Sequence, residues 1–379
     1  MGDKKPIIFD PKKESREEFS KRYPVHKIVD AYEQELLKEL FLIRNPQYRF
    51  NPNYAEAFES FKAEHLAGGP MEHAGTWFYF PWNMTLAHYL PDAMHQELRT
   101  ARNKYLITKE EQEKFYGFKV GIGGLSVGSH AALTIAMMGG ARTMKLADPD
   151  TISGSNLNRI RLDYTHVGES KCDVVTQLVY QTNPYADLES HPEGISADGL
   201  EAFIKDLDIF VECMDNPELK IRSRLVAKKF GIPVVMATDN GDSIIFDIER
   251  YDLDPGLELF NGVAGHLTLE EFQKFPPQEL PKLATKIAGP GYVNPKMLHS
   301  VSEVGRSLYS WPQLGDAATL AGVATAYVIK RLALGEPLRS GKMEVNLDAI
   351  FDPGYHDPEN ERERESERNN YLRRIGFEV

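Results

Sequence analysis

Short hydrophobic runs in the middle of the chain alternate with segments of helical periodicity. Five runs rich in Val, Ile, Leu and Phe predict strands, at residues 118–123, 143–148, 187–191, 207–213 and 232–238. Helical patterns lie between them and begin near Ser129, Lys171, Asp198 and Pro217. This alternation predicts an α/β fold with a doubly wound, mainly parallel sheet over residues 101–250.

The first 100 residues have a different pattern. Apolar positions recur near helical period over residues 25–43, which predicts one amphipathic helix. Two aromatic-rich runs, 76–82 and 85–90, flank a turn that contains Asn83 and predict a β-hairpin. We therefore expect a helical and hairpin N-terminal extension, in which the aromatic rings either pack internally or form a peptide-binding surface.

Proline and glycine interrupt the pattern after residue 251. Residues 253–312 are expected to form a long excursion with little regular structure, of the kind that often serves as a lid or binding loop. A helix over 316–334 and a strand over 343–347 would return the chain to the core, which makes 251–351 a crossover region. The highly charged tail, 352–379, is expected to be a solvated helix or a frayed end.

Composition places this chain of 379 residues among soluble globular proteins, because 42% of its residues are hydrophobic and 26% are charged. No apolar stretch approaches the roughly 20 residues that span a bilayer, so no membrane association is expected. The net charge of −12 disfavours non-specific binding to nucleic acid. The N-terminus lacks the apolar segment of a signal peptide, and we expect a cytoplasmic protein.

Cysteine and histidine are too sparse for a structural metal site. Cys172 and Cys213 are the two cysteines, and no C-x-x-C pair occurs. The 11 histidines show no paired helical spacing. We therefore expect neither zinc nor a disulfide framework.

A glycine-rich turn follows the first predicted strand of the sheet. Gly123, Gly124, Ser126 and Gly128 lie just before a helix, where backbone N–H groups can bind a phosphate. The turn does not fit the dinucleotide pattern G-x-G-x-x-G, because Ser126 occupies the third glycine position. Residues 124–128 also fit G-x-S-x-G, so an α/β-hydrolase that uses Ser126 as its nucleophile is an alternative.

Further polar residues follow the second and fourth predicted strands. Asp148 ends the second strand, where a carboxylate can bind ribose hydroxyls, and Asp150 follows in the next turn. The segment Asn156-Leu157-Asn158-Arg159 and then Lys171 come next. The sequence Cys213-Met214-Asp215-Asn216 follows the fourth strand.

This spaced set resembles the ThiF/MoeB superfamily of adenylating enzymes, which are related to ubiquitin-activating enzymes. The resemblance implies a Rossmann-like fold of the ThiF type, ATP and Mg²⁺ as cofactors, and a homodimer. It assigns nucleotide binding to the glycine-rich turn, Asp148 and Asp150, and the metal to Asp215. Arg102, ahead of the first strand, is similar to the family's arginine that reaches the partner subunit's nucleotide.

The residue types suit the formation of an acyl-adenylate, in which a carboxylate must approach the anionic α-phosphate. Arg102, Arg159 and Lys171 could offset negative charge, Asn156 could donate a hydrogen bond, and Asp215 could hold Mg²⁺. Each of these groups is expected to lower the activation free energy by about 2 to 4 kcal/mol.

Departures from the family pattern narrow the expected reaction. Residues 214–379 contain no cysteine that could accept the acyl group as a thioester. We therefore expect adenylation of a carboxylate on a peptide, namely a ribosomally made precursor, followed by direct nucleophilic attack. This chain looks like the peptide-tailoring branch of microcin-type and pantocin-type antibiotic maturation. Activation of a sulfur-carrier or ubiquitin-like C-terminus and a non-catalytic nucleotide-binding module are the alternatives.

Overall fold

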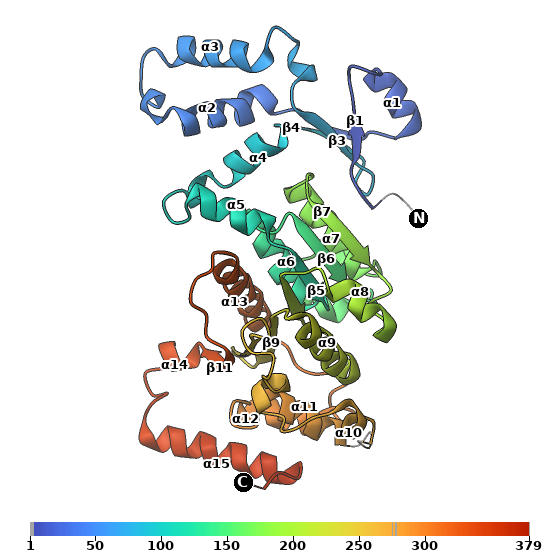
Figure 1. The fold of residues 1–379 in the computed structure, drawn as a ribbon, viewed down its shortest axis with the longest axis vertical. Helices are drawn as coiled ribbons and strands as arrows, with labels where there is room; N and C mark the ends of the chain where they lie inside the picture. Colours follow the sequence, from blue (N-terminus) through green and yellow to red (C-terminus); the bar gives the residue numbers. More distant parts are fainter. Residues whose placement is uncertain (1–3, 275, 277–278, 379) are drawn as a thin grey trace. The chain divides into compact units, whose positions relative to one another are not determined.

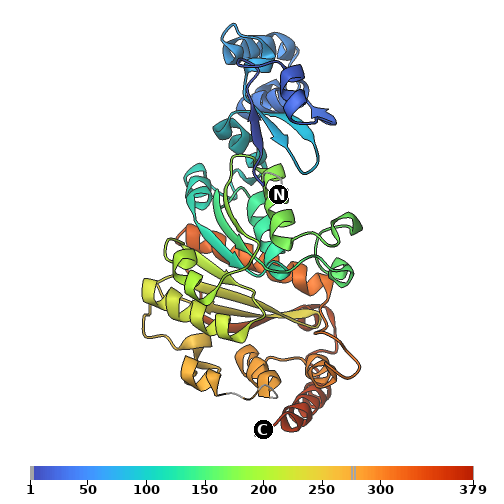
Figure 2. The same cartoon turned by 90° about the vertical axis from the view of Figure 1, so that its right-hand side faces the viewer.

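The computed structural model describes residues 4–274, 276 and 279–378, and its chain divides into two compact units (Figures 1 and 2). Unit 1 comprises Met1–Tyr116, Ala136–Arg142 and Thr176–Ala186. Unit 2 comprises Gly117–Ile135, Thr143–Val175 and Asp187–Val379.

Unit 2 is built on a seven-stranded sheet in the order β11-β10-β9-β8-β5-β6-β7. The five strands from β9 to β7 are parallel, and β10 and β11 add an antiparallel edge. The predicted α/β fold with a doubly wound, mainly parallel sheet is thus confirmed. The strand bounds are β5 Val120–Gly123, β6 Thr143–Ala147, β7 Asp187–His191, β8 Ile209–Glu212, β9 Val234–Asn240, β10 Ser243–Glu249 and β11 Gly341–Asn346.

The direction of strand addition reverses between β5 and β8. The chain adds β6 and β7 on one side of β5, then returns to add β8 and β9 on the other side. Ligands of such sheets bind outside the carboxyl ends of the strands at this switch point. The topology therefore predicts a ligand-binding site at the turns that follow β5 and β8.

Helices cover both faces of this sheet. Helices α8 and α9 contribute Phe203, Ile204 and Ile221 to a large apolar core that also contains Val234 of β9. Helix α13 lies against β9 and β10. The helix bounds are α6 Val127–Met137, α7 Lys171–Thr182, α8 Leu200–Ile204, α9 Pro217–Phe230, α13 Gly315–Ala333, α14 Asp348–Phe351 and α15 Pro358–Arg374.

The segment expected to lack regular structure contains three short helices, α10 Leu269–Gln273, α11 Leu280–Ala288 and α12 Pro295–Glu303. Thr268 and Glu271 form a capping box at the start of α10, and the Asn294 side chain caps α12. Pro295 occupies the first position of α12, where proline is tolerated because its missing N–H would have no helical partner. The proline signal therefore marks helix starts within much of this excursion.

Unit 1 contains a four-stranded sheet in the order β1-β3-β4-β2. The aromatic hairpin is formed by β3 Thr76–Phe80 and β4 Thr85–Tyr89, with β1 Ile7–Phe9 and β2 Lys27–Val29 at the edges. Its helices are α1 Arg16–Arg22, α2 Lys38–Arg44, α3 Tyr54–Leu66, α4 Asp92–Arg99 and α5 Lys109–Gly117. No helix within the described residues combines the length and apolar character needed to span a membrane.

The single amphipathic helix predicted over residues 25–43 is interrupted in the structure. Residues Lys27–Val29 pair with β4, a π-helical turn covers Tyr32–Leu37, and α2 follows. Ile28 and Val29, which fit the helical pattern, lie exposed on the edge strand. Pairing with the hairpin overrides the local periodicity there.

Rings of the aromatic hairpin pack inside Unit 1 around His88. The imidazole stacks between Trp77 and Tyr32, with both centroid separations at 4.1 Å. Its Nδ1 lies 3.0 Å from Asp30 Oδ1, and its Nε2 lies 2.6 Å from the carbonyl oxygen of Ala74. These contacts favour the packing interpretation of the aromatic residues.

A fully buried charged cluster joins three elements of Unit 2. The Arg224 guanidinium on α9 donates to Glu249 Oε2 of β10 at 2.6 Å and to Glu212 Oε2 of β8 at 2.8 Å. Tyr251 Oη and the Phe260 amide donate to the other oxygen of Glu249, at 2.5 and 2.6 Å. Buried ions of this kind are tolerated because every one of them has charged or hydrogen-bonding partners.

Replacing Arg224 should therefore destabilise the protein strongly. Arg224→Met leaves Glu249 buried without a cation, and we expect a loss of about 3–5 kcal/mol in the free energy of unfolding. Urea denaturation followed by circular dichroism measures this loss. Lys229→Met on the same helix breaks an ion pair with Glu201 whose side chains are 59% and 53% exposed, and should cost less than about 1 kcal/mol. Equal losses in the two variants would contradict the assignment.

Candidate functional site

The turns that follow β5 and β8 are in direct contact. Gly124 has a φ of +88°, and a Cβ there would lie 2.2 Å from the carbonyl oxygen of Cys213. The Cys213 amide donates to the Gly123 carbonyl oxygen at 2.7 Å. Only glycine satisfies both the backbone conformation and the close approach at position 124. The glycine-rich turn and the Cys213–Asn216 loop thus form one continuous surface at the switch point.

Lys171 lies in a cluster of the two carboxylates that follow β6. Its Nζ is 2.8 Å from Asp150 Oδ2 and 4.0 Å from Asp148 Oδ1. Asp148 also accepts hydrogen bonds from the amides of Leu125, at 2.6 Å, and Asp150, at 2.8 Å. Burial raises the pKa of Asp148, and Lys171 and the two amides oppose this effect. The carboxylate of Asp148 thereby ties the glycine-rich turn to the end of β6.

Arg159 is held in place by polar atoms on several sides. Its Nε donates to Ser126 Oγ at 3.3 Å, and its Nη1 donates to the Ser155 carbonyl at 3.0 Å and to Asn158 Oδ1 at 2.9 Å. The backbone is fixed as well, since His130 Nε2 lies 2.5 Å from the Arg159 carbonyl oxygen. A guanidinium held by neutral oxygens keeps its charge available for an anionic ligand.

The contact with Arg159 also bears on the hydrolase alternative. A nucleophilic serine needs a base that accepts its proton. In the described part of the chain, the side chain within hydrogen-bond distance of Ser126 Oγ is a guanidinium, which cannot accept one. This contact favours a role for Ser126 in orienting Arg159.

Asn156 lies in the 3-10 turn Gly154–Asn158 and is buried. Its Oδ1 accepts a hydrogen bond from the Ser153 amide at 3.0 Å, as part of a capping box. The side chain therefore shapes the turn that carries Arg159, in addition to any contact that its amide N–H groups make with a ligand.

Asp215 is exposed at the end of the β8 loop. The next residue, Asn216, caps α9 by accepting from the amides of Glu218 and Leu219. Within the described residues, Asp215 has no hydrogen-bond or ion-pair partner, so its carboxylate is available. The loop itself is anchored by the buried Glu212, whose Oε1 accepts from the Met214 amide at 2.8 Å.

An available carboxylate fits the metal that the resemblance implies. Mg²⁺ prefers oxygen ligands and is usually held by one or two carboxylates together with substrate phosphates. No cluster of three or more His, Cys, Asp or Glu side chains with metal-binding geometry occurs in residues 4–274, 276 and 279–378. A divalent cation bound here would take Asp215 as a protein ligand and further oxygen ligands from phosphates.

Neither cysteine is activated as a nucleophile. Cys172 is buried on α7, and its thiol lies 3.2 Å from the Leu146 carbonyl oxygen. Burial raises the pKa of Cys172. Burial, with added repulsion from Glu212, raises the pKa of Cys213 to about 12. Both thiols are therefore protonated at neutral pH.

Asp239, near the end of β9, was missed by the sequence analysis. It is 5% exposed, and its Oδ2 accepts a hydrogen bond from Gln313 Nε2 at 2.9 Å. Its Oδ1 is buried and has no hydrogen-bond partner within the described residues. Burial raises the pKa of Asp239 to about 6, with Gln313 and Arg159 opposing the rise. The missed signal was a carboxylate at the carboxyl end of a parallel strand, two residues beyond the apolar run.

Arg102 belongs to Unit 1 and is exposed in the 3-10 turn Ala101–Asn103. The neighbouring Asn103 side chain donates to Gln112 Oε1 at 2.8 Å and to the Met138 carbonyl at 3.1 Å. These hydrogen bonds hold the turn in place, and the Arg102 side chain is exposed to solvent. A contact of Arg102 with a nucleotide remains a prediction.

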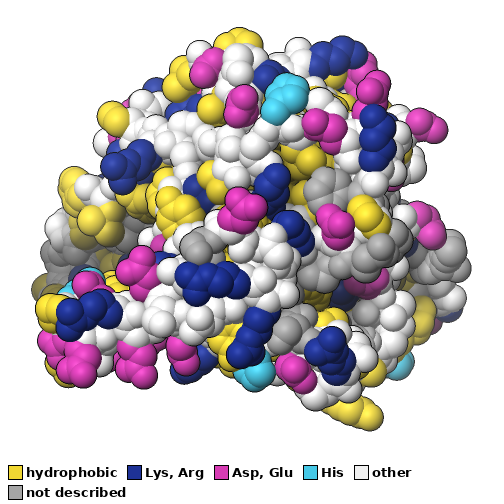
Figure 3. All heavy atoms as spheres, turned by 90° about the horizontal axis from the view of Figure 1, so that it is seen from below, with side chains coloured by type: hydrophobic (Ala, Val, Ile, Leu, Met, Phe, Trp, Pro, Cys, Tyr) yellow, Lys and Arg dark blue, Asp and Glu magenta, His cyan; other side chains and the backbone are white. Residues whose placement is uncertain are grey.

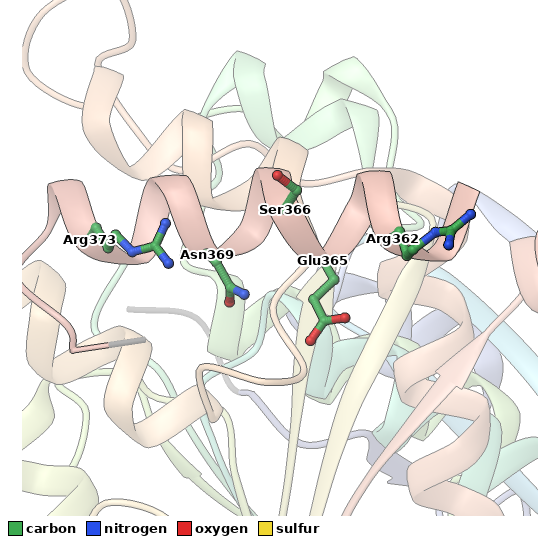
Figure 4. Close-up of a pocket in the computed structure, with 5 residues that line it drawn as sticks. All are labelled: Arg362, Glu365, Ser366, Asn369 and Arg373. Carbon is green, nitrogen blue, oxygen red and sulfur yellow. The ribbon is translucent and has the colours of Figure 1, made fainter. Parts of the chain in front are cut away.

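A separate hollow lies on α15, far along the chain from these residues. It is lined by five polar side chains of that one helix, Arg362, Glu365, Ser366, Asn369 and Arg373. Glu365 and Asn369 point to one side of the helix and Ser366 points to the other (Figure 4). Acidic and basic side chains are interspersed on the face shown in Figure 3. Nothing in this hollow converges on a ligand.

The middle of the chain is similar to proteins of a known family. Residues 100–244 match the family model of the ThiF family. A Mycobacterium tuberculosis protein described as uncharacterized protein MT1398 is 32% identical over 282 residues, 74% of this chain and 39% of that protein. The adenylyltransferase and sulfurtransferase UBA4 of Kluyveromyces lactis is 32% identical over 135 residues, 35% of this chain and 30% of that protein. The chain thus spans about two fifths or less of the length of these relatives.

Two solved structures are similar to parts of this chain. Escherichia coli MccB in complex with MccA has a TM-score of 0.48 and 18% identity, and the match covers 67% of this chain and 66% of that one. PaaA has a TM-score of 0.47 and 21% identity, with 67% and 77% covered.

The buried carboxylate of Asp239 should make stability depend on pH. Because its pKa is raised to about 6, the folded protein binds this proton more tightly than the unfolded chain, and stability falls as pH rises from about 4 to 6. Asp239→Asn removes this cost and should stabilise the protein by on the order of 2 kcal/mol at pH 7.5. Urea denaturation at pH 7.5 and pH 4 checks this, since the gain should largely vanish at pH 4. A loss of stability at pH 7.5 would contradict it.

Proposed function

We propose that this chain, whose residues 100–244 match the model of the ThiF family, is an ATP-dependent enzyme that activates a carboxylate by adenylation. The observation that carries the proposal is the arrangement of charges at the switch point. Lys171 lies beside Asp148 and Asp150, Arg159 is held by neutral oxygens, and Asp215 is free. Two cations and a free carboxylate around a glycine-rich turn suit a nucleotide with its metal.

The proposed chemistry follows from these charges. An oxygen of the substrate carboxylate attacks the α-phosphorus of ATP, the bond to the bridging oxygen breaks, and pyrophosphate leaves with the electron pair. Arg159 and Lys171 offset the negative charge that builds up between carboxylate and phosphates. Asp215 would hold Mg²⁺, which when bound neutralises phosphate charge. Asp148 would bind the ribose and Asn156 would position the Arg159 turn.

The proposed substrate is a carboxylate on a peptide or small protein, in the manner of the peptide-tailoring branch. Both cysteines have raised pKa values, so direct attack on the adenylate is proposed in place of an enzyme thioester. The match to UBA4 supports a second candidate, activation of a sulfur-carrier C-terminus. We also propose a homodimer in which the exposed Arg102 of one subunit completes the site of the other.

The first test compares nucleotides. ATP with Mg²⁺ should bind more tightly than NAD in isothermal titration, because the clustered cations match a triphosphate. Lys171→Ala should weaken ATP binding by about 10-fold or more through loss of a charge-assisted contact. Lys229→Ala, which removes an exposed lysine of Unit 2, is the matched control and should change it less than twofold.

Two outcomes would contradict adenylation. Tighter binding of NAD would indicate hydride-transfer chemistry. ATP binding without exchange of labelled pyrophosphate into ATP, across a panel of peptides and carrier proteins with free C-termini, would indicate a non-catalytic module.

The thiols provide an independent prediction. Because burial raises the pKa of both Cys172 and Cys213, the folded protein should react with DTNB at pH 7.5 at least about 10²-fold more slowly than the urea-unfolded chain. Absorbance at 412 nm follows the reaction. Rapid labelling of one thiol that ATP suppresses would instead support a thioester route and the carrier-activating candidate.

A further inference from the structure

Asp239 carries a buried oxygen without a partner at the edge of the proposed nucleotide site. Its Oδ2 is taken by Gln313, whereas its Oδ1 has no hydrogen-bond partner among the described residues. A buried carboxylate oxygen without a partner is costly, and native proteins rarely retain one without a function. The unpartnered Oδ1 of Asp239 therefore indicates a ligand that binds this oxygen.

Asp215 and Asp239 lie at the carboxyl ends of two neighbouring parallel strands. In the pair of β8 and β9, Phe210 lies opposite Val234 and Val211 opposite Val235. Asp239 lies near the end of β9, and Asp215 lies in the loop that follows β8, three residues after Glu212. The carboxylates of both residues are among the charges that act on the thiol of Cys213, the first residue of that loop.

Among the residues that the structure describes, no Lys, Arg or His side chain forms an ion pair with Asp215 or Asp239. Arg159 is the positive group that acts on Asp239, but its bonds go to Ser126, Ser155 and Asn158. Within the described residues, Asp239 has no ion pair closer than 4.0 Å. Asp316, at the start of α13, adds further negative charge. The negative electrostatic potential of these carboxylates therefore favours binding of a cation that the chain itself does not supply.

We infer that Asp239 is a second protein ligand, beside Asp215, for the divalent cation that accompanies the nucleotide. This inference rests on the proposed function. Two carboxylates from neighbouring strand ends, together with phosphate oxygens and water, form the hard oxygen set that Mg²⁺ and Mn²⁺ prefer. Gln313 orients the carboxylate so that the uncommitted oxygen is Oδ1.

Mn²⁺ binding tests the inference without turnover. Free Mn²⁺ is measured by electron paramagnetic resonance during titration of the full chain saturated with α,β-methylene-ATP. Asp239→Asn should weaken Mn²⁺ binding by at least 10-fold and change the affinity for the metal-free nucleotide by less than threefold. Asparagine can still accept the Gln313 hydrogen bond, and circular dichroism verifies the fold. Asp215→Asn should lose Mn²⁺ affinity to a similar degree.

Asp316→Asn is the control, because it removes one negative charge from the same neighbourhood without removing a ligand. It should weaken Mn²⁺ binding by less than threefold. A metal swap gives a second readout, since Asp239→Cys should favour Cd²⁺ over Mn²⁺ by at least 10-fold relative to the wild type.

The outcomes separate the inference from the proposed function. If the wild type binds no ATP analogue, the proposed function fails. If it binds nucleotide and Mn²⁺ but folded Asp239→Asn does so equally well, the function stands and the inference is overturned. Equal losses in Asp239→Asn and Asp316→Asn would also overturn it, because they would indicate an effect of charge alone.

Discussion

Burial of the Arg224 guanidinium between Glu212 and Glu249 is the constraint on which the rest of Unit 2 depends. The three charges lie under the sheet and link β8, α9 and β10. Glu212 has a second task, because its other oxygen accepts the Met214 amide in the loop that carries Asp215. The buried ions thus help to set the position of the loop that carries the exposed Asp215. Charges without access to water resist rearrangement, since each displaced ion would lose its compensation.

The candidate site is charged and ordered before any ligand arrives. Lys171 is held by Asp150, and Arg159 is held by hydroxyl, amide and carbonyl oxygens. If a nucleotide binds here as proposed, it would meet two cations that are already oriented, so little reorganisation would accompany binding. The cost of this arrangement is visible at Asp239, where burial opposes ionisation and works against stability. Buried ionisable groups whose pKa is shifted at a cost in folding stability are common in functional sites.

The sequence predicted those parts of the fold and site whose signals are local. The strand and helix alternation, the glycine-rich turn and the spacing from Asp148 to Lys171 each lie within a short window. Asp239 was missed because its environment is assembled by Gln313, which is distant in sequence and approaches only in the folded chain. The helix predicted over residues 25–43 failed for a similar reason, since pairing of Lys27–Val29 with β4 cannot be read from periodicity. In both segments, contacts between residues distant in sequence determine the structure.

Gly124 packs so closely against the Cys213 carbonyl that no side chain fits between the two loops, which follow different strands. The end of the site that would face phosphates therefore has a single geometry, which a side chain at position 124 would destroy. The β9 end is different, because Gln313 comes from the irregular segment between α12 and α13, whose length the sheet does not fix. Exchange of that segment would change how Asp239 is oriented while leaving the contact between Gly124 and Cys213 intact, so the two ends of this surface can diverge at separate rates.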